Sequence, residues 1–341
     1  MIDSARNQAF IFVTGASRSG TTVLSRVIGN SATVETLNEL HFFGELTQLE
    51  DPPKPLATER AAQAVAMTLA RYDRDYWVEQ PTDPEWMTAR RIVSYLDDTD
   101  RVPANLFALT MAEIVEQSDA ERICEQTPRN IYYARKILDA FPNARIVHVM
   151  RDPRAVLASQ KARHKIRKLG GTNVPPSEVL RLWLNYHPFS MLRLWRSATR
   201  QALDLQAHER FRIVRYEDLI LEPEATIKPL CEFLDVDYAA ELLNVPHWGS
   251  STVEHSESAG LSSASLDKWR TVLDGAEIAY CEKQTREERE QFGYADSEDS
   301  RSVLPGYLNM GLRLPIHVAG ALIANPGRVL TIGRAVFGRQ S

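Results

Sequence analysis

A glycine-bracketed segment near the N-terminus carries residue types that bind an anion. It runs from Thr14 to Thr22 as T-G-A-S-R-S-G-T-T, after the apolar run F-I-F-V and before the helical pattern V-L-S-R-V-I. A strand, a glycine-rich loop and a helix N-terminus in this order direct backbone N–H groups and the positive end of the helix dipole at one place. We therefore expect a phosphate-like group to bind here.

The composition of this loop sets it apart from a triphosphate site. Gly15 and Gly20 have the spacing of a Walker loop, but Thr21 stands where such a loop has the lysine that contacts the β- and γ-phosphates. The loop instead offers one guanidinium group and several hydroxyl groups. The residues that we expect to contact the anion are Ser17, Arg18, Ser19, Gly20, Thr21 and Thr22.

A second strand and helix carry another set of anion-binding side chains. The sequence R-I-V-H-V-M-R-D-P-R-A-V-L-A-S-Q-K-A-R predicts a strand that leads into a helix, with Asp152 as N-cap and Pro153 as first residue. Ser159 and Arg163 are four residues apart and share one helical face, and Arg151 lies at the strand's end. Arginine can bond an oxyanion through two N–H groups. Spacing alone leaves open whether these arginines bind a second phosphate or pair with carboxylates.

Short apolar runs that alternate with helical periodicity predict the scaffold for both sites. This pattern is typical of a parallel sheet with helices on both faces, which binds ligands at the carboxyl ends of its strands. We predict a three-layer, P-loop-like α/β fold with a central parallel sheet of five strands at 10–14, 33–39, 122–127, 145–150 and 211–216. A helical insertion at about 52–118 is expected to cap the carboxyl ends of the strands.

Composition narrows the class of protein. The 341 residues carry a net charge of -5, so we expect no general nucleic-acid binding. The three cysteines are far apart and predict reduced, buried thiols. No apolar targeting segment precedes the first apolar run, and no run of 18 apolar residues follows, so a cytoplasmic protein is expected.

Both anion motifs together resemble those of the PAPS-dependent sulfotransferases, nearest to the bacterial and tyrosylprotein-type branch. The first loop is similar to the family's 5′-phosphosulfate loop, and V-M-R-D-P-R-A-V-L-A-S-Q-K-A-R is similar to its 3′-phosphate motif. Further similar pieces are E-Q-T-P-R-N, V-R-Y-E-D-L and L-D-K-W-R, so that the resemblance covers about residues 9 to 294.

The resemblance implies a function and assigns roles to residues. The implied reaction moves a sulfuryl group from PAPS (3′-phosphoadenylyl sulfate) to a hydroxyl acceptor, with PAP as product and without a metal ion. Arg18 would stabilise the leaving group, and Glu39 would be the catalytic base, with His41 as the alternative. The 3′-phosphate would contact Arg151, Ser159 and Arg163. Four further residues would close over the nucleotide, or form a core aromatic with surface charges: Tyr216, Ser265, Lys268 and Trp269.

One departure from the family pattern bears on catalysis. Many relatives have lysine before the T-P of the third-strand motif, whereas this chain has Gln126, which carries no charge. This favours, as one alternative, a catalytically weak PAP-binding protein. The other alternative is a P-loop kinase-like phosphotransferase, against which the missing loop lysine counts.

The C-terminal segment differs from the rest of the chain. We assign residues 1–300 to one sulfotransferase domain and 301–341 to a tail, which contains five arginines, apolar stretches and no acidic residue. The tail is expected to pack against the body or a second copy in a homodimer, or to lie on an anionic membrane surface. The acceptor cannot be read from the sequence; carbohydrate, glycolipid, small metabolite and peptidyl tyrosine stay open.

Overall fold

The structure is a computed structural model, and it divides the chain into two compact units. It describes residues 1–46, 54–74, 78, 80–116, 118, 120–165, 168–169, 172–173, 175–245, 261, 263–298 and 303–324. The sheet unit consists of Met1–Gly15, Gly20–Val149 and Gln201–Val245. The helical unit consists of Ala16–Ser19, Met150–Arg200 and Pro246–Ser341. The predicted domain boundary at residue 300 stays a prediction.

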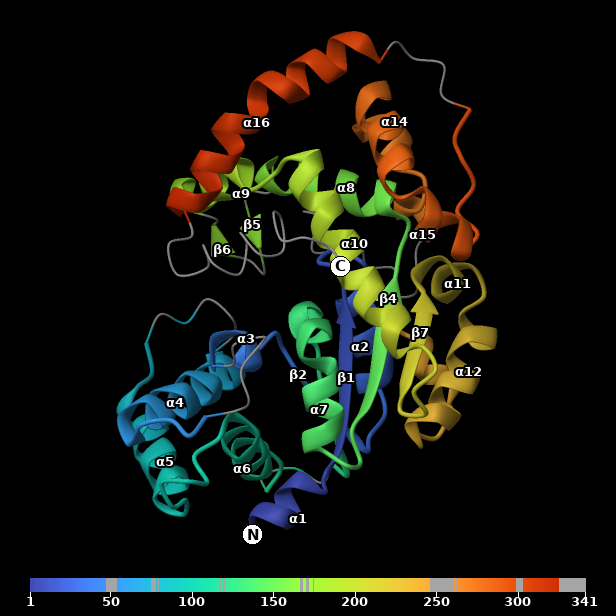
Figure 1. The fold of residues 1–341 in the computed structure, drawn as a ribbon. Helices are drawn as coiled ribbons and strands as arrows, with labels where there is room; N and C mark the ends of the chain where they lie inside the picture. The colour runs from blue at the N-terminus through green and yellow to red at the C-terminus, as the bar shows by residue number, and fades with distance from the viewer. Residues whose placement is uncertain are drawn as a thin grey trace. The chain divides into compact units, whose positions relative to one another are not determined.

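A five-stranded parallel sheet forms the centre of the sheet unit (Figure 1). Its strands are β1 (Ala9–Gly15), β2 (Val34–Leu37), β3 (Arg122–Glu125), β4 (Arg145–Met150) and β7 (Phe211–Arg215), in the order β2-β3-β1-β4-β7. The predicted fold class and all five strands are thus confirmed. β2 ends at Leu37, two residues earlier than expected, so Glu39 lies in the following loop.

Helices cover both faces of this sheet because the side chains of β1 alternate between them. On one face, the Phe107 ring lies 5.6 Å from Phe10 and 5.7 Å from Phe12, centroid to centroid. On the other face, α2 packs so closely that a Cβ on Gly29 would lie 2.1 Å from the Thr36 hydroxyl of β2. The described helices of the sheet unit, with 3₁₀ helices labelled η, are α1 (Ile2–Arg6), α2 (Thr21–Gly29), α3 (Phe42–Leu46), α4 (Thr58–Arg74), α5 (Asp83–Ser94), α6 (Pro103–Val115), η1 (Pro128–Tyr133), α7 (Ala134–Ala140), α11 (Tyr216–Leu221), α12 (Pro223–Leu234) and η3 (Ala240–Leu243).

The insertion between β2 and β3 is helical, with α4, α5 and α6 in its described part. Ten of the thirteen residues of α6 are buried, because this apolar helix lies on the sheet face through Phe107. α4 reaches the loop after β2, where Arg71 Nη1 donates to the Leu40 carbonyl at 2.5 Å. The insertion therefore extends the layer on one face, and α4 touches the loop at the carboxyl end of β2.

The helical unit has its own core around a tryptophan. The described elements that it contains wholly or in part are α8 (Pro153–Ala162), η2 (Arg163–Lys165), β5 (Lys168–Leu169), β6 (Thr172–Asn173), α9 (Pro176–Leu184), α10 (Pro188–Leu205), η4 (Ser263–Ser265), α13 (Trp269–Val272), α14 (Gly275–Gln284), α15 (Arg286–Gln291) and α16 (Leu304–Ala324). Trp269 packs in one cluster with Leu157, Leu192 and Cys281. The three cysteines of the chain are free and buried, as expected. In the described part of the chain, no helix is long and apolar enough to cross a membrane.

Candidate functional site

The first anion loop begins at the end of β1 and ends at the start of α2. Arg18 adopts a φ of 78°, and Gly20 caps α2 with a φ of 100°. A Cβ at Gly20 would lie 2.3 Å from Cδ2 of Tyr216, so only glycine fits this position. The first N–H groups of a helix have no acceptor within the helix. In α2 these are the N–H groups of Thr21 and the residues that follow it, and they lie at the end of this loop.

Within the helical unit, four predicted site residues come together. Arg18 Nε donates to Ser159 Oγ at 3.0 Å, and Arg151 Nη1 donates to the Arg18 carbonyl at 3.2 Å. The other terminal nitrogen of Arg151 donates to the carbonyl of Ser265 at 3.1 Å. Arg163 lies one helical turn after Ser159, at the start of η2. Two guanidinium groups and a hydroxyl thus gather where the sequence predicted an anion.

Side-chain donors hold the backbone of this loop. Besides Arg151, Gln160 Nε2 donates to the Ser17 carbonyl at 3.2 Å. The Ser19 hydroxyl is buried and has no hydrogen-bond partner among the described residues. Sequence reasoning missed Gln160, although it follows Ser159 directly on α8.

The second strand leads to the two candidate bases, which contact each other in the sheet unit. Glu39 Oε2 lies 3.1 Å from His41 Nε2. The Glu39 side chain is 36% exposed and that of His41 13%, so solvent and a substrate can reach the carboxylate. His41 has a φ of 55°, a backbone conformation that costs energy in a residue with a Cβ.

A buried carboxylate that the sequence did not single out fixes this base loop. Glu125 Oε1 accepts a hydrogen bond from the Leu40 N–H at 3.3 Å, and also from the Thr127 hydroxyl. Its Oε2 accepts from the Thr127 N–H at 3.2 Å and from Asn130 Nδ2 at 2.6 Å. The His41 N–H in turn donates to Thr127 Oγ1 at 3.2 Å. The peptide groups on both sides of Leu40 are therefore anchored.

Burial raises the pKa of Glu125 to about 7, because desolvation disfavours the charged carboxylate more than its hydrogen bonds favour it. The Glu39 carboxylate adds to this rise. A signal for Glu125 existed in the sequence, since an acidic residue that ends an apolar strand is buried only with partners.

Two further contacts lie at the carboxyl edge of the sheet. Thr22 Oγ1 donates to Gln126 Oε1 at 3.4 Å, which joins the first residues of α2 to the segment after β3. Gln126 is buried, and Tyr216, at the start of α11, is buried against Gly20. Gln126 thus places an uncharged amide beside Thr22, at the start of α2.

The remaining predicted nucleotide contacts differ in exposure. Lys268 is exposed, whereas Trp269 is 3% exposed and has the Arg154 guanidinium 4.3 Å from its ring centroid. Arg154 is itself paired with Asp152 and Glu282. This arrangement favours the alternative that the sequence left open, a core aromatic with surface charges. The sequence did not single out Arg154.

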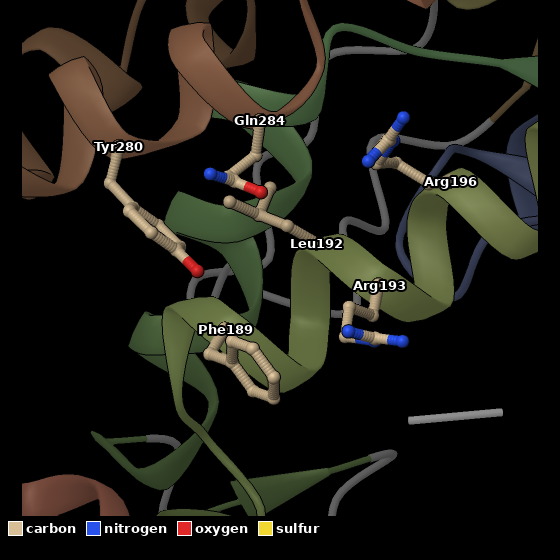
Figure 2. Close-up of a pocket in the computed structure, with 6 residues that line it drawn as sticks. All are labelled: Phe189, Leu192, Arg193, Arg196, Tyr280 and Gln284. Atoms are coloured by element: carbon tan, nitrogen blue, oxygen red, sulfur yellow. The ribbon is translucent and has the colours of Figure 1, made fainter. Parts of the chain in front are cut away.

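A cavity in the helical unit lies between α10 and α14 (Figure 2). In Figure 2, Tyr280 and Gln284 point from α14 toward Leu192 on α10. Its volume is ≈ 40 Å³, which holds a few water molecules and no nucleotide or acceptor. The cavity is therefore not a substrate pocket. The described residues also contain no group of three or more side chains suited to hold a metal ion.

Comparison with solved structures supports the fold. The chain superimposes on the sulfotransferase domain from the Synechococcus PCC 7002 olefin synthase with a TM-score of 0.54 and 20% identity, covering 85% of this chain and 95% of that one. The sulfotransferase domain from the curacin biosynthetic pathway gives a TM-score of 0.53 and 18% identity, covering 85% and 99%. At these identities the likeness concerns the fold alone.

Comparison with known sequences concerns the family. The chain is 23% identical over 282 residues to a protein-tyrosine sulfotransferase of Drosophila melanogaster, covering 79% of this chain and 48% of that protein. It is 26% identical over 248 residues to an omega-hydroxy-beta-dihydromenaquinone-9 sulfotransferase of Mycobacterium bovis, covering 66% and 62%. The chain thus spans about half the length of its Drosophila relative. The model of the sulfotransferase family matches residues 10–240, two thirds of the chain, which therefore belongs to the sulfotransferase family.

Proposed function

We propose that this protein transfers a sulfuryl group from PAPS to the hydroxyl group of an acceptor. The observation that carries the proposal is the hydrogen bond from Arg18 to Ser159, with Arg151 bound to the Arg18 carbonyl. It joins the two motifs that the sequence assigned to separate phosphates. Membership of the sulfotransferase family supports the same reaction.

The loop residues fit the phosphosulfate end of such a nucleotide. The buried Ser19 hydroxyl has no partner among the described residues, and an anion in the loop would supply an acceptor. Gly20 keeps the space that a Cβ would fill. The N–H groups and hydroxyls of Thr21 and Thr22 would hold the 5′-phosphate at the start of α2.

The charged residues would divide the chemistry between them. When bound, PAPS supplies an activated sulfuryl group whose bond to the 5′-phosphate oxygen breaks as a bond to the acceptor oxygen forms. Arg18 would stabilise the negative charge that develops on the departing phosphate oxygen. Glu39 would take the proton of the acceptor hydroxyl, and His41, 3.1 Å away, would orient the carboxylate or accept the proton in its place.

The acceptor class is a hydroxyl compound. The names of the relatives specify a tyrosine and an omega-hydroxy menaquinone, which share a hydroxyl group and little else. Their common chemistry therefore supports hydroxyl sulfation without selecting an acceptor.

Calorimetric titration with PAP, and with ATP and Mg²⁺, tests the proposal. Wild-type protein should bind PAP tightly without metal, and Arg151→Ala should weaken this binding by about 100-fold, the loss expected for a charge-assisted pair. Arg91→Ala is the matched control, because Arg91 is half exposed on α5 and pairs with Glu113. Unchanged circular dichroism shows that a variant is folded. Tight binding of ATP and Mg²⁺ with weak PAP binding would refute the proposal in favour of a phosphotransferase.

Gln126 supports a second candidate, a PAP-binding protein of weak activity. Its amide accepts a hydrogen bond from the Thr22 hydroxyl through Oε1, and its NH₂ group would bring a donor but no positive charge to the sulfuryl oxygens. A screen of hydroxyl acceptors with labelled PAPS separates the two candidates. Tight PAP binding without a sulfated product, together with turnover in Gln126→Lys, would establish the weaker function.

A further inference from the structure

The last described helix turns an apolar face outward. α16 (Leu304–Ala324) has 21 residues and is therefore about 31 Å long. Five of its large apolar side chains are between 55% and 80% exposed. They form what we call the α16 stripe: Leu304, Leu308, Leu312, Ile316 and Ile323.

The opposite face of α16 already has its partners in the helical unit (Figure 1). His317 is buried, and its Nδ1 lies 3.2 Å from the Leu184 carbonyl of α9. A Cβ on Gly320 would lie 2.4 Å from Leu184, and one on Gly306 the same distance from Ala276 of α14. At 100° per residue the mean direction of these positions lies about 125° around the helix from that of the α16 stripe. The orientation of the helix is therefore fixed by contacts that leave the stripe outside.

This arrangement reverses the usual surface helix, which exposes its charged face. Arg313 is the only charged residue of α16, and it lies over the Trp183 ring on the packed side, 5.6 Å from its centroid. A row of exposed apolar side chains without charges is typical of a surface that a membrane or another protein covers.

The charge of the surrounding sequence identifies the kind of partner. Residues 301–341 contain five of the forty Lys and Arg residues of the chain and none of its forty-five Asp and Glu residues. Two copies joined through this surface would bring two cationic segments together. An anionic membrane instead offers an apolar interior for the stripe and negative headgroups for the arginines.

We propose that the α16 stripe docks the protein onto the surface of an anionic lipid membrane. The leucine and isoleucine side chains enter the boundary between headgroups and acyl chains, with the helix lying along the surface. The positive charge of residues 301–341 favours a membrane with anionic headgroups. This inference is independent of the proposed sulfuryl transfer, because it uses neither the anion loop nor the base loop.

Vesicle flotation of the full chain without nucleotide tests it. Wild-type protein should float with phosphatidylcholine vesicles that contain phosphatidylglycerol, and much less with phosphatidylcholine alone. The double variant Leu308→Ser/Leu312→Ser should bind about 10- to 100-fold more weakly, since it removes two large apolar side chains from the lipid. Arg328→Glu/Arg334→Glu should remove the preference for phosphatidylglycerol, and added salt should weaken wild-type binding.

Met87→Ser is the matched control, because Met87 is a 72% exposed apolar residue on α5 in the other unit. It should float as wild type does. Equal flotation of wild type and the Leu308/Leu312 variant would overturn the proposal. A wild-type dimer that the variant dissociates, without vesicle binding, would also overturn it and assign the stripe to contact between copies. PAP titration of the same samples reports separately on the proposed function.

Discussion

Two loops at the ends of strands carry the candidate chemistry. Side chains bind the backbone carbonyls of one loop and the backbone N–H groups of the other. The loop after β1 contains the strained Arg18, and side-chain donors bind its carbonyls, as Arg151 and Gln160 do. The loop after β2 contains the strained His41, and side-chain acceptors bind its N–H groups, as Glu125 and Thr127 do.

This difference explains how two short loops can have different tasks. In the first loop the backbone carbonyls already accept hydrogen bonds from side chains, so an approaching anion faces N–H and O–H donors, which favours binding. Where the N–H groups are engaged, the backbone is fixed and the side chains of Glu39 and His41 are presented, which suits proton transfer. Substitutions in the first loop should therefore change nucleotide affinity, and those in the second should change turnover.

The largest effect is expected at the base itself. Glu39→Gln keeps the shape of the side chain and removes the proton acceptor, so kcat should fall by about 10²- to 10⁴-fold while the Kd for PAP stays the same. His41→Gln should lower kcat less, because the carboxylate remains. Rates with a sulfated product and calorimetry with PAP measure both. A larger loss in His41→Gln than in Glu39→Gln would reverse the two roles.

The next effect tests the first loop. Gly20→Ala places a Cβ 2.3 Å from Tyr216 at a φ of 100°, so the loop must distort. PAP affinity should fall by about 10- to 100-fold, given ~1–3 kcal/mol of strain. Gly44→Ala is the control, because a Cβ there meets nothing within 4 Å. Normal PAP affinity with reduced kcat in Gly20→Ala would contradict the division of tasks between the loops.

The two loops also differ in what the sequence could predict. Local pattern located all five strands. It also predicts that Arg18, Ser159 and Arg151 contact anions, because these residues follow apolar strands or lie on a marked helix face, and this stays a prediction. The place of Glu125 at the end of an apolar strand could indicate a buried, partnered carboxylate, but its contact with Leu40, 85 residues away in the chain, could not be read from local spacing. Likewise, local pattern left open whether Trp269 is a core aromatic, because its burial depends on packing with α8 and α14, which are distant from it or face it only in the folded unit.

A smaller effect on turnover tests the anchor of the base loop. In Glu125→Gln an amide NH₂ group faces donors such as Leu40 N–H and Asn130, so the loop loses hydrogen bonds and its fixed geometry. We expect kcat to fall by about 10-fold, with unchanged PAP affinity. Glu85→Gln controls for general destabilisation, since Glu85 is a buried carboxylate paired with Arg74 on α4. If both variants lose activity equally, Glu125 has no specific role in positioning the base.

The smallest effect is the contribution of the base-loop anchor Glu125 to the dependence of stability on pH. Because burial raises the pKa of Glu125 from 4.5 to about 7, its contribution is fully present below the unfolded value and is lost as the pH rises through about 7. Buried His148 acts in the opposite sense: its pKa is lowered to about 3, so its contribution is lost only as the pH falls below 6.5. Between pH 6.5 and pH 8 the free energy of unfolding of wild type should therefore fall by about 1 kcal/mol relative to that of Glu125→Gln, because the buried histidines with lowered pKa values contribute equally in both proteins. Urea unfolding at both pH values measures this difference, and parallel slopes for the two proteins would show that Glu125 is already ionised at pH 6.5, with its four hydrogen bonds outweighing its burial.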